Sequence, residues 1–272
     1  MKKLIVILLT LAVVVLPSCK NQNKKKAAQE AEKTEISEKE KLVTEELKLN
    51  LQALGESVGK MKSVPFIYSS NGAVKLSPKE KLVKPDYLLN PALVADLVTL
   101  TQKYRAVAML SVDKSVAELY EMPVKEYEEN VAKVAADIND EALVEFAEAL
   151  HTNKAAGEAF SKFFDAEVEA NRAPFFWEAV SAALVEQLFV CTKNIDKFIE
   201  MFDDQSASEV TYNFVCVHEG IKSLLEFYPE MESLNTILDP LYVINAINVE
   251  QLKAQLIELK GEIEVIRVAL LN

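Results

Sequence analysis

Hydrophobic residues recur at intervals of three and four positions from Ser37 to the end of the chain. The first stripe follows a capping box formed by Ser37 and Glu40. Its members are Val43, Leu47, Leu51, Leu54, Val58 and Met61. Residues at this spacing share one face of an α-helix, and charged residues occupy the opposite face. We therefore expect the helix to dock on a helical bundle; pairing with another protein is the alternative.

Similar stripes continue along the rest of the chain, separated by proline, asparagine and glycine. A short helix is predicted at Pro78, because Ser77 and Glu80 form a second capping box around it. Further stripes predict helices over residues 93–120, 127–138, 143–168, 195–202, 210–224 and 252–270. The sequence Asn139-Asp140 is expected to end one of these helices and to cap the next.

Residues 174–191 (PFFWEAVSAALVEQLFVC) are apolar nearly all round, as in a helix that is buried on most sides. We expect this segment to be the central helix of the core. Glu178 and Glu186 interrupt it, about 80° apart around a helix axis. We interpret them as its narrow exposed edge; the alternative is a pair of partly buried carboxylates with raised pKa values.

The stripes, the short loops after residue 77 and the scarcity of glycine predict an all-α fold. Alanine, leucine, glutamate and lysine, all strong helix formers, dominate the composition. We expect a bundle of about eight to ten antiparallel helices, because short loops favour antiparallel neighbours. This helical bundle domain is predicted to span residues 36–272.

The N-terminus carries a targeting signal. Lys2 and Lys3 precede an apolar run over residues 4–16, which is shorter than the roughly 20 residues that a membrane-spanning helix needs. Residues 1–18 are therefore predicted to be a signal peptide.

The end of this signal, Leu16-Pro17-Ser18-Cys19, resembles the lipobox of bacterial lipoproteins, with Pro17 as a mild departure. The resemblance implies that Cys19 is acylated, with palmitate among its lipids, and becomes the mature N-terminus. Several acyl chains, at about 0.8 kcal/mol per buried CH₂, form a stable anchor in the lipid bilayer. Lys20 follows where an acidic residue would retain the protein at the inner membrane, so the resemblance implies the outer membrane of the cell envelope. The alternative is an ordinary secretory signal with a chance cysteine.

Residues 19–35 are predicted to be a lipidated tether, because they are polar, rich in lysine and too poor in apolar side chains to form a core. Removing residues 1–18 removes two lysines. The mature chain then has 28 basic and 42 acidic residues, a formal charge of −14. Such an acidic chain is a poor partner for nucleic acid.

Two motifs resemble metal sites, and we reject both. Glu148 and His151 match one half of the E-x-x-H pattern of diiron bundles, but the second half is missing and both residues face away from the predicted apolar stripe. Cys216 and His218 would lie about 160° apart on a helix. We predict no metal and no cofactor.

The remaining candidates allow two interpretations each. Cys191 and Cys216 are either a disulfide or two buried small hydrophobic residues. Phe175, Phe176 and Trp177 either line a pocket for a small apolar ligand or belong to the core. We favour the core, because consecutive residues on a helix point in different directions.

The sequence contains no nucleophile elbow, no Cys-His-Asn set and no glycine-rich phosphate loop. In its lipobox, tether and acidic helical body the chain resembles helical lipoproteins of Bacteroides-type bacteria. We therefore expect a non-enzymatic envelope lipoprotein with a structural or protein-interaction role, with other envelope proteins as partners. The alternative is a helical binding protein for a small apolar ligand near residues 174–191.

Overall fold

The computed structural model describes residues 43–62, 68–69, 72–152 and 156–272. The predicted signal peptide, the lipidation site Cys19 and the tether lie outside these residues. The chain divides into two units, Met1–Glu46 and Leu47–Asn272. The description below concerns the second unit.

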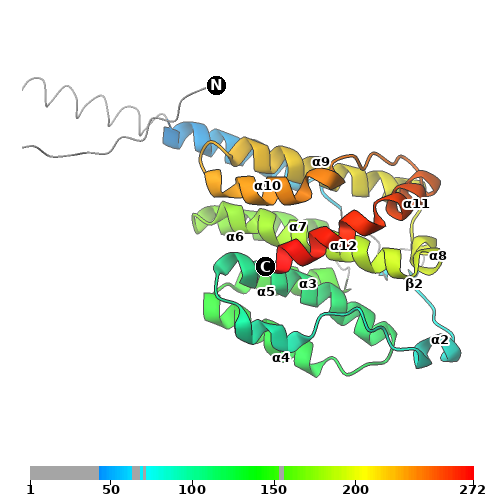
Figure 1. The fold of residues 1–272 in the computed structure, drawn as a ribbon. Coiled ribbons are helices and arrows are strands. Elements are labelled where there is room, and N and C mark those ends of the chain that lie inside the picture. Colours follow the sequence, from blue (N-terminus) through cyan, green and yellow to red (C-terminus); the bar gives the residue numbers. More distant parts are fainter. Residues whose placement is uncertain (1–42, 63–67, 70–71, 153–155) are drawn as a thin grey trace, which may run out of the picture. The chain divides into compact units, whose positions relative to one another are not determined.

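The second unit is a multi-helix bundle, which confirms the predicted all-α fold (Figure 1). The α-helices after residue 77 are α2 (Pro78–Leu82), α3 (Leu100–Leu119), α4 (Lys125–Ile138), α5 (Glu141–Thr152), α6 (Ala156–Glu169), α7 (Ala173–Lys193), α8 (Ile195–Phe198), α9 (Asp204–Leu224), α10 (Glu232–Leu238), α11 (Val249–Glu258) and α12 (Lys260–Leu271). Short 3-10 turns are η1 (Pro91–Asp96), η2 (Ile199–Met201), η3 (Pro229–Met231) and η4 (Asp239–Leu241). In the described part of the chain, the extended structure is a two-residue antiparallel ladder of β1 (Tyr68–Ser69) and β2 (Gly72–Ala73), with Tyr68 opposite Ala73.

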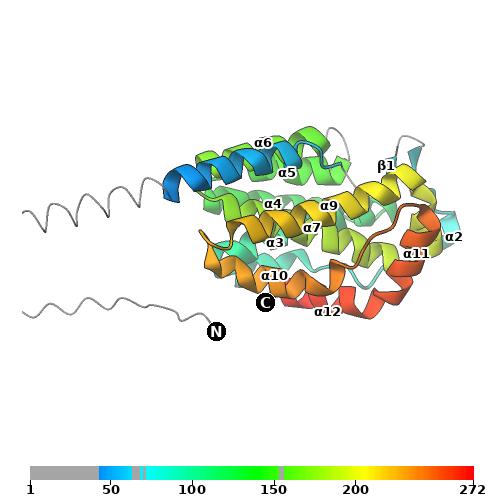
Figure 2. The ribbon, with the colours of Figure 1, turned by 90° about the horizontal axis from the view of Figure 1, so that it is seen from above.

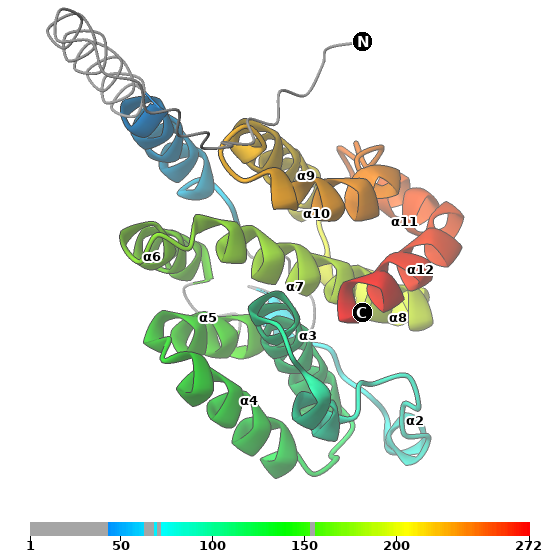
Figure 3. The same cartoon turned by 60° about the vertical axis from the view of Figure 1, so that its left-hand side comes forward.

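Helix α7 is the centre of the bundle, as predicted from its continuous apolar sequence. It packs most extensively against α3 and also contacts α6, α9 and α12. In Figure 3, α3, α4 and α5 lie on one side of α7, and α9 and α10 lie on the other. Residues 176–192 of α7 are all buried, so almost the whole circumference of this helix is covered.

Local sequence signals explain where several helices begin and end. Thr99 and Gln102 form a capping box at the start of α3. Helix α4 ends at Asn139, which adopts the left-handed conformation (φ 54°) that asparagine tolerates. The next residue caps α5, because the backbone N–H of Leu143 donates to Asp140 Oδ1 at 3.0 Å. The predicted role of Asn139-Asp140 is confirmed.

Three of the predicted stripes are interrupted. The stripe over residues 93–120 divides into the 3-10 turn η1 and helix α3, because Leu97 between them is extended (φ −74°, ψ 121°). The stripe over residues 143–168 divides into α5 and α6, which pack against each other. The ring of Phe146 lies 5.5 Å from Phe160 and 4.7 Å from Phe163, so the chain reverses between the two helices. The C-terminal stripe divides at Leu259 into α11 and α12. The second and third stripes still face the core, which is why spacing alone does not reveal the breaks.

The first predicted helix docks on the bundle, as expected. Residues 43–58 are helical, and in the second unit Leu54, Val58 and Met61 are buried. The Tyr212 hydroxyl of α9 donates to the Ser57 carbonyl at 3.0 Å. Figure 2 shows the part of this helix that belongs to the second unit, residues 47–58, alongside α6 and α9.

Candidate functional site

The aromatic residues at the start of α7 form part of a filled core. Phe176 and Trp177 have no exposed surface, and their rings meet edge to face at 4.9 Å. Phe175 stacks on Tyr104 of α3 at 4.8 Å. Phe164 of α6 meets the Phe176 ring at 5.1 Å. The structure thus places these rings in the core, the interpretation that the sequence favoured, rather than around a pocket.

The ring of Trp177 lies directly on the backbone of Gly220 in α9. A Cβ atom at residue 220 would come within 2.3 Å of Trp177 Cζ2, which no side chain tolerates. Glycine is therefore required here for the close approach of α9 to α7.

Cys191 and Cys216 are free thiols in the structure. Both are buried, and burial raises the pKa of each thiol to about 12. They act as small apolar residues of α7 and α9, and the structure contains no disulfide between them.

Glu178 and Glu186 are buried, so their interpretation as the exposed edge of α7 is wrong. Glu178 Oε2 accepts a hydrogen bond from Arg105 Nε of α3 at 2.6 Å. Burial raises the pKa of Glu178, and the charge of Arg105 opposes that rise. Arg105 Nη1 also donates to the Leu270 carbonyl of α12 at 3.3 Å. This pair therefore joins α3, α7 and α12.

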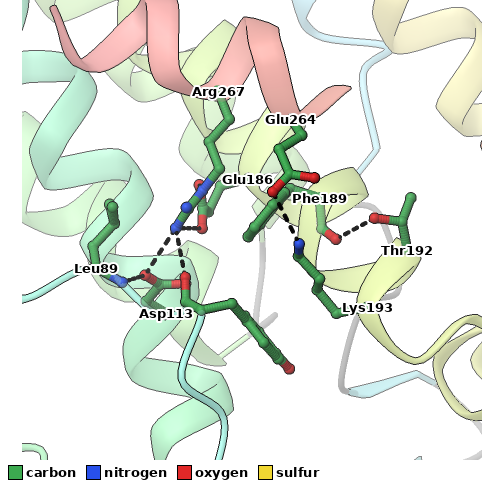
Figure 4. A network of polar contacts seen from close by, with 9 residues as sticks. Leu89, Asp113, Glu186, Phe189, Thr192, Lys193, Glu264 and Arg267 are labelled. Atoms are coloured by element: carbon green, nitrogen blue, oxygen red, sulfur yellow. Dashed lines mark hydrogen bonds and ion pairs between the residues drawn. The ribbon is translucent and has the colours of Figure 1, made fainter. Parts of the chain in front are cut away.

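Glu186 belongs to a second buried cluster, shown in Figure 4. Arg267 extends from α12 and donates to both Glu186 oxygens, at 2.7 and 2.8 Å. Its guanidinium lies 3.9 Å from the centroid of the Phe189 ring. Asp113 of α3 is 3.8 Å from Arg267 and accepts a hydrogen bond from the Leu89 N–H at 2.6 Å.

One guanidinium thus faces two carboxyl groups that have no exposed side-chain surface. Burial raises the pKa of Asp113 well above its ordinary value, and the charge of Glu186 raises it further. Burial also raises the pKa of Glu186, against the opposing hydrogen bonds and charge of Arg267. Arg267 thus forms its close ion pair with Glu186, whereas Asp113 lies farther from the guanidinium.

A third cluster joins α3 to the turns around α5 and α6. The Tyr104 hydroxyl donates to Asp140 Oδ2 at 2.5 Å and lies 3.2 Å from Glu167 Oε2. Arg172 Nη2 lies 3.1 Å from the Asp140 carboxylate and 3.0 Å from that of Glu167. Burial and the neighbouring Asp140 raise the pKa of Glu167 to about 8. Burial opposes ionisation of Asp140, but hydrogen bonds from Glu167, Tyr104 and the Leu143 backbone lower its pKa.

These three clusters explain how the helices are held in position; they do not indicate a ligand or a substrate. Their carboxyl groups are covered by the helices that they join. A buried ion pair contributes little net stability but is costly to break. The clusters therefore specify how α12 and the α5–α6 pair are positioned on α3 and α7.

The structure has a cleft elsewhere, between α3, α4 and α5. Its volume is about 230 Å³. The residues that line it are Ser111, Lys114, Tyr127, Glu128, Val131, Ala132, Val144, Ala147 and Glu148. The Lys114 ammonium lies 3.1 Å from the Glu128 carboxylate and 3.8 Å from that of Glu148.

The residues that resemble metal ligands do not converge. Within the described ranges, no group of three or more His, Cys, Asp or Glu side chains could hold a metal ion. Glu148 is exposed and pairs with Lys114, while the side chain of His151 lies outside the described residues. Cys216 is buried, and the His218 ring stacks on Tyr242 at 3.9 Å.

One helix in the described part of the chain, α7, is long and apolar enough to cross a membrane. However, 94% of its most apolar stretch is buried inside the bundle. This burial is typical of the core helix of a globular domain, in agreement with the central position of α7.

An apolar stripe on the surface runs along α11 and α12. Gly261, Val265 and Val268 lie within about 60° of one another around the axis of α12. Val265 is 65% exposed and Val268 is 53% exposed. Ile257, at the end of α11, is 57% exposed. We call these four residues, together with the exposed Ala254, the outer stripe.

A scan against protein-family models found no match for this chain, and neither did searches of curated proteins and of solved structures. Its function is therefore inferred from its own residues.

Proposed function

We propose that the chain is a lipoprotein of the cell envelope, anchored in the outer membrane through acylated Cys19, and that its helical domain works through contacts with other envelope proteins. The lipobox supports the anchor. The outer stripe supports the contacts, and it is the observation on which this proposal chiefly rests.

The outer stripe has the properties of a helix-binding surface. Its valine and alanine side chains are small, glycine has none, and a Cβ atom added at Gly261 would meet no atom within 4 Å. A partner backbone could therefore approach closely along α12. A completely buried valine or isoleucine side chain stabilises an interface by about 1.5–3 kcal/mol relative to an exposed one.

The charges beside the outer stripe indicate the chemistry of the partner. Glu262 and Glu264 lie on opposite sides of the stripe on α12, and both are exposed; Glu264 also lies 3.4 Å from the Lys193 ammonium of α7. Glu258 lies beside Ile257 at the end of α11 and is also exposed. We therefore propose that the partner is an amphipathic helix of another envelope protein, with an apolar face and flanking lysine or arginine residues.

The anchor is tested by growing cells with an alkyne-tagged palmitate and measuring the label on this chain. We expect label in the wild-type chain, recovery of the chain with membranes, and loss of both in Cys19→Ala. Equal labelling of the two chains would refute the anchor.

The contact surface is tested by placing a photo-crosslinking phenylalanine analogue at Val268 in intact cells. The matched control is Val215 of α9, which is 52% exposed but lies outside the outer stripe. We expect a discrete adduct at residue 268 alone, mapped by mass spectrometry to a basic amphipathic segment. The double variant Val265→Glu, Gly261→Glu should abolish it. Adducts of equal yield at residues 215 and 268 would contradict the proposal.

A further inference from the structure

The short helix α2 ends in two of the most exposed large apolar side chains of the described residues. Leu82, its last residue, is 80% exposed, and Val83, which follows it, is 75% exposed. No residue of α2 is buried, and Figures 1 and 3 show this helix at the edge of the bundle. Single apolar residues scattered over a surface are ordinary, but these two are adjacent and project together.

Lysines surround this apolar pair in the sequence. Residues 75–86 contain the lysines Lys75, Lys79, Lys81 and Lys84. They also contain two acidic residues, Glu80 and Asp86, so the segment has a formal charge of +2. The whole chain has a formal charge of −12, so all other residues together carry −14. We call residues 75–86 the basic tip.

The end of α3 holds the basic tip in a defined position. The Lys84 ammonium donates to the Tyr120 carbonyl, at the residue that follows α3. The Lys81 ammonium lies 2.5 Å from the Glu121 carboxylate. Leu82 and Val83 therefore project from a segment that is fixed on both sides of them.

The ion pairs around the basic tip do not remove its positive charge. Glu121 brings one negative charge to Lys81. Lys197 of α8 brings one positive charge to within 4.0 Å of Glu80, so these two neighbours cancel each other. Lys75 and Lys79 are exposed, and their ammonium groups are accessible to a partner from solvent.

This arrangement matches the surface of a phospholipid bilayer that contains anionic lipids. Apolar side chains between lysines enter the boundary of headgroups and acyl chains, while the ammonium groups remain among the phosphates. The negative potential of such a surface attracts lysines close to it. The rest of the chain is acidic and is repelled by the same potential, so the basic tip is the part that would face the bilayer.

We propose that the basic tip is a second membrane contact, in which Leu82 and Val83 enter an anionic phospholipid surface between the lysines. This contact goes beyond the anchor at Cys19, because it would determine which side of the helical domain faces the bilayer. It does not depend on acylation, and it is separate from the outer stripe, whose proposed partner is a protein.

The test measures whether the basic tip enters lipid when the domain is held at a vesicle. The protein is the mature chain with Cys19→Ser and an N-terminal histidine tag, which binds nickel-chelating lipid in place of the acyl chains. Val83→Cys carries an environment-sensitive NBD fluorophore, and the buried thiols of Cys191 and Cys216 should not react with it. The matched control is Val98→Cys. Val98 is 85% exposed and precedes α3, whose 20 residues place it about 30 Å from the end that holds the tip.

We expect the NBD emission at residue 83 to rise and to move to shorter wavelengths on vesicles of phosphatidylcholine mixed with phosphatidylglycerol. On phosphatidylcholine alone it should not change, and emission at residue 98 should change on neither vesicle. Leu82→Ser should lower the ratio of docked to free domain about tenfold, near the lower limit for burying a leucine side chain. Lys79→Gln should lower this ratio about fivefold, the contribution of one lysine near an anionic surface. Its control, Lys222→Gln in the last turn of α9, should have no effect.

Three results would overturn the proposal: no change at residue 83 on either vesicle, an equal change on both vesicles, or equal changes at residues 83 and 98. A ratio that neither Leu82→Ser nor Lys79→Gln lowers would also exclude the basic tip. A photo-crosslinked protein at residue 83 in intact cells, without any change on vesicles, would assign the tip to an acidic protein instead. Because the vesicles contain no envelope protein, failure here would leave the crosslinking test at Val268 unaffected.

Discussion

Replacing Arg267 with methionine should expose the energetic role of the α12 cluster. The substitution retains an unbranched apolar stem against Phe189 but removes the only cation within 4 Å of Glu186 among the described residues. Glu186 must then either remain buried as an uncompensated anion or bind a proton.

Proton binding sets the upper limit of the cost. The ordinary pKa of a glutamate is 4.5, and one pH unit corresponds to about 1.4 kcal/mol. Keeping Glu186 protonated in the folded state therefore costs up to about 4 kcal/mol at pH 7.5 and about 1.4 kcal/mol at pH 5.5. The first value agrees with the roughly 3–5 kcal/mol measured when one partner of a buried ion pair is removed.

The assay is urea unfolding at both pH values, followed by the fluorescence of Trp177, the single tryptophan of the chain. The control is Lys253→Met, because Lys253 and Asp196 form an exposed pair at 2.6 Å that should contribute less than about 1 kcal/mol. In the double variant Arg267→Met, Glu186→Gln, the loss relative to the wild type should no longer depend on pH. A loss below about 1 kcal/mol at pH 7.5, or an equal loss at both pH values, would refute the reasoning.

Three further predictions follow from the other buried groups. The pKa of Glu167 is about 8 in the fold, above its ordinary 4.5, so the folded state binds more protons than the unfolded state between these pH values. The free energy of unfolding should therefore fall as pH rises from 4.5 to 8, and Glu167→Gln should flatten that decline in urea titrations. Gly220→Ala should destabilise the bundle by about 1–3 kcal/mol or more, because the new Cβ atom clashes with the Trp177 ring. Gly261→Ala, with open space around it, should instead stabilise the bundle by about 0.5–1 kcal/mol, and the unfolding temperatures measured by calorimetry distinguish the two. Cys191 and Cys216 should resist a thiol reagent until the protein is unfolded, because both are buried and weakly acidic, and rapid labelling in the native state would contradict their placement.

The central helix could be predicted because its signal is local. Residues 174–191 are apolar on nearly every side, and only a position inside the core accommodates such a helix. The same reasoning placed the aromatic triplet in the core. The caps at Asn139 and Asp140 were also readable, because a cap depends on residues that are close in sequence.

The buried ion pairs could not be predicted from periodicity, because their partners are distant in sequence. Glu178 is 73 residues from Arg105, and Glu186 is 81 residues from Arg267. One signal was nevertheless present. Arg267 follows Ile266 directly and lies between Ile263 and Leu270, on the core side of a predicted helix. A cation on the core face of a helix requires a buried anion, and the sequence of α7 contains two glutamates, Glu178 and Glu186.

The divisions of the two long stripes were hidden for a related reason. Helices α5 and α6 both turn their apolar faces to the core, so the three-four spacing continues in register across residues 153–155. The same holds across Leu259 between α11 and α12. The cleft was missed as well, since Lys114, Glu128 and Glu148 come from three helices whose relative positions no local pattern specifies.

The most direct test of the central claim is the yield of the photo-crosslinked adduct at Val268 in intact cells, measured with and without the anchor. If the domain is held at a membrane to contact another envelope protein, the adduct forms in the wild-type chain and its yield falls sharply when Cys19→Ala releases the chain. Because the outer stripe is unchanged in that variant, its folding and its affinity for a partner should remain as before. An adduct whose yield does not depend on Cys19, or the absence of any adduct at Val268 in the anchored chain, would contradict the account.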